Sequence, residues 1–353
     1  MNSTRQLSKY TFCIIIYIFM CFLILYIRIN YKNNNNDLKT TLLFEKYNVD
    51  NSKYNNLNND DKIIVNNSTM TIENNVIDVL QKISSVCEKY NKTSSLERTH
   101  FLYNHKNKVL YCWIHQVASK SFIKLFADLK NISIVDDHYY KQIEKLAPGS
   151  IEELLDVIDD VGVFKFLITR HPYERLVSSF RKNIEDNRKY SRQSWNFVPK
   201  IFSITRPQLF NDSSESSMEK IFHIDRRLKI IPTFEEFIIW LLQQSEDDDD
   251  EYWNQYNSHC AVCQMTFDYI LKIDSSIFKQ DFNYILSNFK DNLKLNKLKL
   301  LSENKSTDFN RTCIYLSQLS KKIFNQLYAR YKFDFEMFDY SSNLYLENCI
   351  KKI

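Results

Sequence analysis

The sequence predicts an α/β fold in which helices flank a central parallel sheet, behind an N-terminal transmembrane anchor. Two strand-to-helix units predict the sheet: apolar runs at 109–114 and 164–168 precede helices at 119–130 and 172–184. Neither run alternates polar and apolar residues, which is typical of strands covered on both faces. Helices interleaved with such strands favour parallel pairing, and the remaining sequence is largely helical.

The N-terminal element is residues 10–27, YTFCIIIYIFMCFLILYI, an uncharged and mostly apolar stretch with basic residues on both sides. It is long enough to span a bilayer as a helix, and no small-residue cleavage site follows it. A buried core helix fits less well, because the segment is apolar on all sides and stands alone at the N-terminus. The pattern therefore predicts an uncleaved signal anchor after a short cytoplasmic tail, residues 1–9. The positive-inside rule barely selects the orientation, because both flanks are basic.

Sequons and cysteines favour a lumenal location for the chain beyond the anchor. N-x-[ST] sequons mark glycosylation of secretory proteins, and an even set of cysteines permits disulfides in an oxidising compartment. The sequons begin at Asn66, Asn67, Asn91, Asn131, Asn211, Asn304 and Asn310, and the cysteines are Cys87, Cys112, Cys260, Cys263, Cys313 and Cys349. We therefore expect a single-pass protein of the secretory pathway whose C-terminal side faces the lumen.

Residues 28–85 are rich in Asn and Lys, as in YKNNNND, and show no sustained period. This composition is typical of a stem that spaces a domain from the membrane, although compositional drift gives the same pattern. The folded lumenal domain is expected at 86–353, which is long enough to bury a substantial core.

Local signals mark further helices in this domain. Ser150 is a helix N-cap, with Glu153 three residues later. PTFEEFIIWLLQQ predicts a helix that starts at Pro232 and Thr233, and a C-terminal helix is expected over 317–330. The acidic run EDDDDE between them is expected to be a solvated loop.

The turn HQVASKS, after the first strand, has groups that can hold an anion. Backbone N–H groups at a helix N-terminus attract anions through unpaired donors and the helix dipole. Ser119 and Ser121 add hydroxyl donors, Lys120 adds a cation, and Ala118 keeps the backbone accessible. An ordinary polar turn fits the same residues. The candidate anion-binding residues here are His115, Gln116, Val117, Ala118, Ser119, Lys120 and Ser121.

Composition excludes other classes of phosphate-binding protein. Gly149 and Gly162 are the only glycines, and the motifs of P-loop kinases and dinucleotide-binding Rossmann enzymes each need more. The net charge of +4 is mild and gives no reason to expect a nucleic-acid partner.

The second unit, FKFLITRHPYERLVSSFRKN, places Arg170 at the carboxyl end of a strand, where α/β sheets bind ligands. Pro172 suits the first turn of the following helix, and Arg175 and Ser178 share its polar face. Arg170 and Ser178 then converge on one phosphate, the arginine bidentately. A solvated basic helix face is the simpler alternative. Two such units in order favour a phosphate-binding site that includes Arg170, Arg175 and Ser178.

RHPYERLVSSFR closely resembles the 3'-phosphate motif of the membrane-bound carbohydrate sulfotransferases, in particular the chondroitin 4-O- and HNK-1 sulfotransferase group. Three later blocks are similar to that family in the same order, and the resemblance spans roughly residues 105 to 341. The blocks are TFEEFIIWLL, EYWNQYNSHCAVCQMTFDYILKID and LYARYKFDFEMFDY.

The resemblance implies a type II enzyme of the Golgi membrane with a P-loop-like sulfotransferase fold. Such an enzyme transfers a sulfuryl group from 3'-phosphoadenosine-5'-phosphosulfate to a glycan hydroxyl. The first turn would hold the 5'-phosphosulfate and the second unit the 3'-phosphate. Cations and helix dipoles stabilise the departing charge, so no metal is expected. An acidic glycosaminoglycan suits the basic side chains of Lys182, Arg188, Lys189, Arg192, Arg226, Arg227 and Lys229.

The first turn departs from the family pattern. The family places a Pro and a catalytic Lys where this chain has His115 and Gln116. Loss of that cation where negative charge accumulates costs on the order of 3 kcal/mol in the barrier. Three outcomes are open: Lys120 compensates, a protonated His115 supplies the charge, or the protein binds without catalysing. We take Lys120 as the working hypothesis.

A general base must deprotonate the acceptor hydroxyl, and histidine is the usual choice near neutral pH. His138 lies between the two donor motifs, where the family often has a His, and is the first candidate. His115 and Glu174 are alternatives.

C-A-V-C at Cys260 and Cys263 has no second metal-binding pair, so a disulfide within it, or from it to Cys313 or Cys349, is expected instead of zinc. Cys112 is expected to be a buried free thiol. Two rival interpretations remain. One is a catalytically inactive homologue that binds a glycan or a partner. The other is an unrelated anchored protein with a helical ectodomain, in which Arg170 and Ser178 would lie far from residues 115–121.

Overall fold

The computed structural model describes residues 79–94, 96–135, 139–211, 216–289 and 307–350, which all belong to one compact unit, Thr71–Ile353. In these ranges no helix is both long and apolar enough to cross a membrane. The predicted anchor at 10–27, most of the predicted stem, and His138 lie outside the described residues.

A four-stranded sheet in the order β1-β2-β3-β4 forms the centre of the α/β part. Strands β2, β3 and β4 are parallel, whereas β1 is antiparallel to β2. The prediction of a wholly parallel sheet is therefore wrong at β1, because the link between β1 and β2 is too short for a crossover. The strands are β1 Phe101–Asn104, β2 Val109–Cys112, β3 Phe164–Thr169 and β4 Tyr269–Lys272.

Register places the two predicted units side by side. Cys112 at the end of β2 pairs with Leu167 of β3, so the turns after both strands leave the same edge of the sheet. All fourteen residues of β1, β2 and β3 are buried, which explains why these strands show no alternation.

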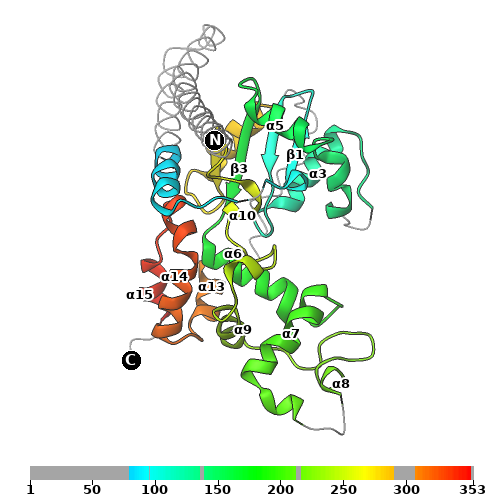
Figure 1. Cartoon of the computed structure of the whole chain (residues 1–353), viewed down its shortest axis with the longest axis vertical. Helices are drawn as coiled ribbons and strands as arrows, with labels where there is room; N and C mark the ends of the chain where they lie inside the picture. The colour runs from blue at the N-terminus through cyan, green and yellow to red at the C-terminus, as the bar shows by residue number, and fades with distance from the viewer. Residues whose placement is uncertain (1–78, 95, 136–138, 212–215, 290–306, 351–353) are drawn as a thin grey trace, which may run out of the picture. The chain divides into compact units, whose positions relative to one another are not determined.

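Helices surround the sheet and form a second, helical part (Figure 1). A helix at 79–90 opens the described region. The others are α3 Ser119–Leu129, α4 Ile143–Leu146, α5 Ile151–Asp159, α6 Pro172–Phe180, α7 Arg192–Thr205, α8 Ser217–Ile221, α9 Phe234–Leu241, α10 Asn257–Cys260, α11 Phe278–Ser287, α13 Phe309–Leu316, α14 Lys321–Met337 and α15 Asn343–Cys349.

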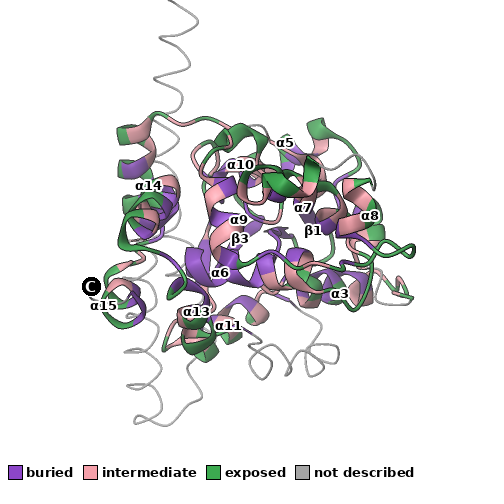
Figure 2. Ribbon diagram, turned by 90° about the horizontal axis from the view of Figure 1, so that it is seen from below, coloured by how far each residue is buried: buried purple, intermediate pink, exposed green. Residues whose placement is uncertain are grey.

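Two apolar clusters hold these elements together. The first joins the sheet to α3 through ring contacts among Tyr111, Phe122 and Phe166. The second surrounds α6, which contacts α13 and α14. Every residue of α6 is buried, and Figure 2 shows it purple in the interior. The helix that carries the second motif is therefore fixed along its whole length.

Local capping explains where most helices begin. The Ser150 hydroxyl accepts a hydrogen bond from Glu153 N at 3.2 Å, as predicted. Thr233 is the N-cap of α9, at the predicted start of this helix, and it forms a capping box. The predicted helix over 317–330 is wrong at its start: α13 ends before Ser317, and Ser320 caps a new helix. The predicted helix 172–184 ends at Phe180 and continues as a π-helical turn, Arg181–Glu185.

The disulfides differ from the predictions. They are Cys87–Cys263, Cys112–Cys260 and Cys313–Cys349. Cys112 is not a free thiol, and the C-x-x-C cysteines bond neither to each other nor to Cys313 or Cys349, because each faces a different element. These two bridges attach the α10 region to β2 and to the helix at 79–90. Their sequence separations of 148 and 176 residues remove much freedom from the unfolded chain.

Candidate active site

The turn after β2 has a left-handed backbone without glycine. Gln116 and Ala118 have φ values of 67° and 63°, a region that costs non-glycine residues roughly 1–2 kcal/mol. No side chain caps α3, whose N-cap residue is Ala118. Backbone that visits the left-handed region in this way is typical of anion-binding nests, in which successive N–H groups point at one anion. Strain of this size is typical of functional sites.

The two predicted motifs meet at Gln116. The Arg170 guanidinium donates to the Gln116 carbonyl oxygen at 3.4 Å, and the Ser178 hydroxyl donates to its side-chain oxygen at 3.2 Å. The rival of an unrelated ectodomain required these residues to lie far apart, so the structure excludes it. Ser178 thereby holds the Gln116 amide, which stands where the family has its lysine.

Arg170 is buried and oriented by several partners. Its Nε donates to Glu174 at 3.2 Å, and Tyr345 donates to the other oxygen of that carboxylate at 3.0 Å. A further Arg170 nitrogen donates to the carbonyl oxygen of Thr307. The Tyr256 hydroxyl accepts from Arg170 N at 2.9 Å and donates to Arg170 O at 2.8 Å. Arg170 is therefore presented at the turn in a fixed position.

Arg175 stabilises the turn by donating hydrogen bonds to backbone carbonyl groups. It donates to the carbonyl oxygens of His115 at 3.1 Å, of Glu251 at 3.4 Å and of Asn254. Its guanidinium also lies 4.9 Å from the ring centroid of Tyr256. These bonds make Arg175 a positioning residue, while its predicted contact with the donor remains a prediction.

His115 is buried between aromatic and acidic side chains. Its Nδ1 lies 3.1 Å from the Tyr140 hydroxyl and its Nε2 lies 3.3 Å from Glu251. Its ring stacks on Tyr252 with centroids 3.9 Å apart. Burial lowers the pKa of His115 despite the neighbouring carboxylate. A neutral imidazole does not replace the missing lysine charge, which disfavours that outcome.

Of the remaining turn residues, some pack in the interior and others lie at the surface. Val117 is fully buried in the first apolar cluster, and the Ser119 hydroxyl lies 3.2 Å from that of Tyr140. Ser121 N donates to Ala118 O at 3.1 Å. Lys120 is exposed, with Nζ 5.5 Å from the ring centroid of Tyr139.

Cations gather around the turn. The pKa of Lys182 falls to about 8 through loss of hydration and then through repulsion by Lys120, Arg170, Arg181 and Lys189. These positive charges are close enough to repel one another, which favours binding of a multivalent anion among them. Arg181 and Lys182 were not among the predicted donor-binding residues, although Arg181 ends the motif RHPYERLVSSFR.

A recess of about 370 Å³ opens beside His115. Trp113, Tyr140 and Tyr252 give it aromatic walls, and Glu251 adds a carboxylate. Aromatic faces with a few polar groups are typical of sites that bind small ligands.

The acidic run 246–251 is not simply a solvated loop. Asp249 forms a buried ion pair with Arg330 at 2.8 Å, and burial raises the pKa of this carboxyl to about 7. Glu251 contacts His115, which brings the end of the run to the site.

A strained turn and an oriented arginine at one edge of the sheet suit the binding of a phosphate or sulfate ester. The chain belongs to the sulfotransferase family, whose model matches residues 99–341. This confirms the family resemblance found in the motifs.

Individual relatives support the same family, at modest sequence identity. The chain is 25% identical to carbohydrate sulfotransferase 11 of Mus musculus over 285 residues, which covers 77% of this chain and 76% of the relative. It is 25% identical to carbohydrate sulfotransferase 10 of Danio rerio over 303 residues, with 76% of each chain covered. Carbohydrate sulfotransferase 14 of Danio rerio is 23% identical, with 73% and 69% covered. No solved structure matches significantly.

Proposed function

We propose that this protein is a carbohydrate sulfotransferase that moves a sulfuryl group from 3'-phosphoadenosine-5'-phosphosulfate to a glycan hydroxyl. The observation that carries the proposal is the meeting of both donor motifs at Gln116, which Arg170 and Ser178 contact together. The names of the similar carbohydrate sulfotransferases support a glycan acceptor.

In the proposed reaction, the glycan oxygen forms a bond to sulfur while the bond from sulfur to the 5'-phosphate oxygen breaks. The acceptor proton passes to a base, for which His138 remains the first candidate. The nest at Gln116 and Ala118 receives the 5'-phosphosulfate, and Arg170 with Ser178 receives the 3'-phosphate. Lys120 supplies the cation that stabilises the departing adenosine bisphosphate.

The structure offers two acceptor surfaces of opposite character. Basic side chains lie after α6, among them Lys182 and Lys189, and suit an acidic glycosaminoglycan. The recess beside His115 has several carboxylates and aromatic walls, which suit an uncharged sugar ring. We favour the basic surface, because the carboxylates of the recess would repel an acidic glycan whereas lysines would attract it. We further propose Golgi residence with a type II anchor at residues 10–27.

The test is sulfonate transfer by the full-length chain from radiolabelled donor to a panel of desulfated glycosaminoglycans and neutral glycans. We expect transfer to an acidic acceptor, with Ser178→Ala reducing donor affinity. Ser203→Ala is the matched control, since its hydroxyl only contacts the Lys200 carbonyl group on α7. No transfer to any acceptor would reject the proposal.

The alternative is an inactive homologue that binds donor or glycan, and the Gln116 amide favours it. Equilibrium binding of adenosine 3',5'-bisphosphate separates the two. Binding with no transfer supports the inactive homologue, whereas transfer above that of Arg170→Ala supports the enzyme.

A further inference from the structure

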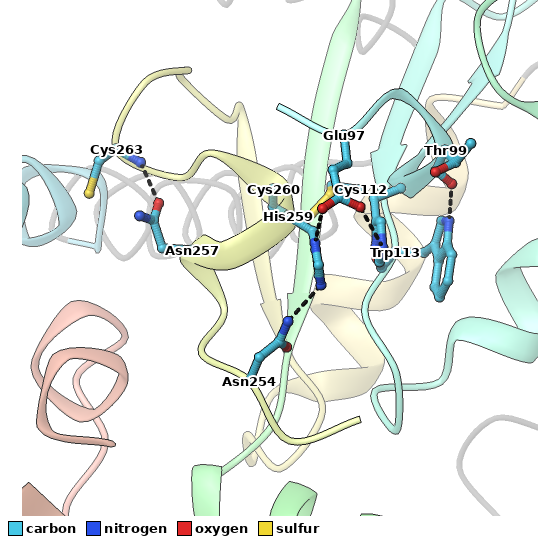
Figure 3. The surroundings of a disulfide bond; sticks show 10 residues. Glu97, Thr99, Cys112, Trp113, Asn254, Asn257, His259, Cys260 and Cys263 are labelled. Carbon is cyan, nitrogen blue, oxygen red and sulfur yellow. Dashed lines mark hydrogen bonds and ion pairs between the residues drawn. A yellow bond between two sulfur atoms is a disulfide. The ribbon is translucent and has the colours of Figure 1, made fainter. Parts of the chain in front are cut away.

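A cluster of three metal-ligating side chains lies apart from the donor turn. Glu97 precedes β1, His100 ends the short 3-10 helix before that strand, and His259 belongs to α10. One ligand atom of each lies within 4.8 Å of those of the others. Figure 3 shows Glu97 beside His259, with the Cys112–Cys260 disulfide next to them.

The hydrogen bonding of His100 fixes which ring nitrogen bears the proton. Its Nδ1 lies 3.0 Å from the Trp113 carbonyl oxygen, which only accepts, so Nδ1 is the donor. In the neutral ring Nε2 then has a bare lone pair, and it lies 3.6 Å from a Glu97 oxygen. Two electron-rich atoms facing each other are stabilised by a cation between them. A backbone carbonyl that fixes the tautomer of a ligating histidine is typical of metal sites.

His259 presents a second unpartnered nitrogen to the same carboxylate. Its Nδ1 lies 2.8 Å from Glu97 Oε1 and is buried, yet it makes no hydrogen bond of suitable direction. The opposite ring nitrogen lies 2.6 Å from the side-chain amide of Asn254. A turn of that amide about its own axis makes Asn254 the acceptor, places the proton on Nε2 and leaves Nδ1 free to ligate. The turn also breaks the 3.3 Å hydrogen bond from Arg175 to the Asn254 side-chain oxygen, so metal binding has to offset this loss.

We propose that Glu97, His100 and His259 bind a divalent transition-metal ion of the zinc class. Two imidazoles and one carboxylate are a common zinc ligand set, and they leave one position for water. At bond lengths of about 2.0–2.2 Å, tetrahedral ligand atoms lie roughly 3.3–3.5 Å apart. His259 lies 2.8 Å from one oxygen of Glu97 and His100 lies 3.6 Å from the other, so ligation through a single oxygen requires the exposed carboxylate to turn.

Solvent reaches the cluster from two sides. The recess of about 370 Å³ includes Glu97 and His100 in its wall, and a second recess of about 560 Å³ includes Glu97 and His259. The half-exposed Glu97 can therefore admit an ion and a water ligand. The two imidazoles are stacked, with centroids 4.1 Å apart and planes 11° apart. Because a metal lies close to the plane of each ligating ring, binding tilts one ring out of this stack.

Such an ion would join the segment before β1 to α10, which follows Asn254. Asn254 also accepts from Arg175, and Trp113 stacks on His100 with centroids 4.4 Å apart. A metal here therefore braces one wall of the recess beside the donor turn. It also supplies an optical reporter, since the tilt changes the surroundings of the Trp113 indole.

The test uses Zn²⁺ alone, added to full-length protein stripped of metal with a chelator. We expect one equivalent to bind, to raise the melting temperature and to change tryptophan fluorescence. Co²⁺ in its place should give the visible absorption of a tetrahedral site. Zinc bound to the protein as purified is measured by elemental analysis.

Glu97→Gln and His259→Leu should each weaken Zn²⁺ binding at least tenfold. His223→Leu is the matched control, because this residue lies away from the cluster in the turn after α8 and should leave binding unchanged. His259 is only partly buried, so its variant is expected to fold even where a His100 variant does not. Absence of saturable binding, or equal affinity in His259→Leu and the wild type, overturns the proposal.

Discussion

The units β2–α3 and β3–α6 share one topology but differ in how firmly they are built. After β2 the chain passes through two left-handed residues, and α3 begins without a side-chain cap. After β3, His171 accepts from Tyr173 N and caps α6, which is buried throughout. The first unit has an exposed lysine at its turn, whereas the arginines of the second are held by protein acceptors.

The difference separates two tasks within one donor site. A rigid unit that fixes Arg170 can recognise a group that stays in place during the reaction, such as a 3'-phosphate. A strained turn with a solvated cation can adjust to the group whose charge changes. If Lys120 acts as proposed, this difference accounts for Gln116 at the position of the family's lysine.

The largest effect is expected when Arg175, in the second unit, no longer supports the turn of the first unit. Arg175→Leu leaves the carbonyl oxygens of His115, Glu251 and Asn254 without this donor. Each unpaired buried group costs roughly 1–3 kcal/mol, so the free energy of unfolding should fall by at least about 3 kcal/mol. Urea unfolding measures this fall. Arg192→Leu, at the start of α7, is the control. A change of less than about 1 kcal/mol would mean that the two units are independent.

Lys120→Ala should act on the reaction without affecting the fold. The side chain is exposed, so the melting temperature should stay unchanged. If Lys120 stabilises the departing bisphosphate, kcat should fall about 100-fold, which corresponds to about 3 kcal/mol. Lys124→Ala, one turn further along α3, is the matched control. Wild-type kcat in Lys120→Ala would show that the strained unit does not supply the cation.

Much of this site could be predicted from the sequence, because hydrophobic period and helix signals are local. The strands β2 and β3, the start of α3 and the N-cap Ser150 all follow from neighbouring residues. The meeting of Arg170 with Gln116 followed from the rule for strand ends.

What could not be predicted depends on pairings between distant residues. Cys112 meets Cys260 only through the three-dimensional fold, across a separation of 148 residues. The role of Arg175 depends on carbonyl groups of a loop near residue 251, which no local pattern encodes. The positive φ of Ala118 could not be predicted either, since glycine is the residue that normally indicates it.

The electrostatic part of the comparison can be tested through Lys182. Its pKa is lowered from 10.5 to about 8 in the folded protein, so between these values the unfolded chain binds more protons. The free energy of unfolding should therefore rise with pH across this window. An anion in the site favours the ammonium form, so affinity for adenosine 3',5'-bisphosphate should fall about tenfold from pH 7 to pH 9. Lys182→Gln should flatten both profiles. If Lys182→Gln kept the pH dependences of the wild type, groups other than Lys182 would be their cause.

The smallest expected effect tests the strain itself. Ala118→Gly relieves a left-handed alanine worth roughly 1–2 kcal/mol but adds about 0.5–1 kcal/mol of unfolded-chain freedom. The net result should be a gain of about 0.5 kcal/mol in the free energy of unfolding. Ala127→Gly is the matched control on the same helix, where the substitution has no strain to relieve and should cost about 1 kcal/mol. Opposite signs for the two variants would locate stored strain at the anion turn. Equal losses would mean that the turn is as relaxed as the helix, and the contrast with β3–α6 would then rest on charge alone.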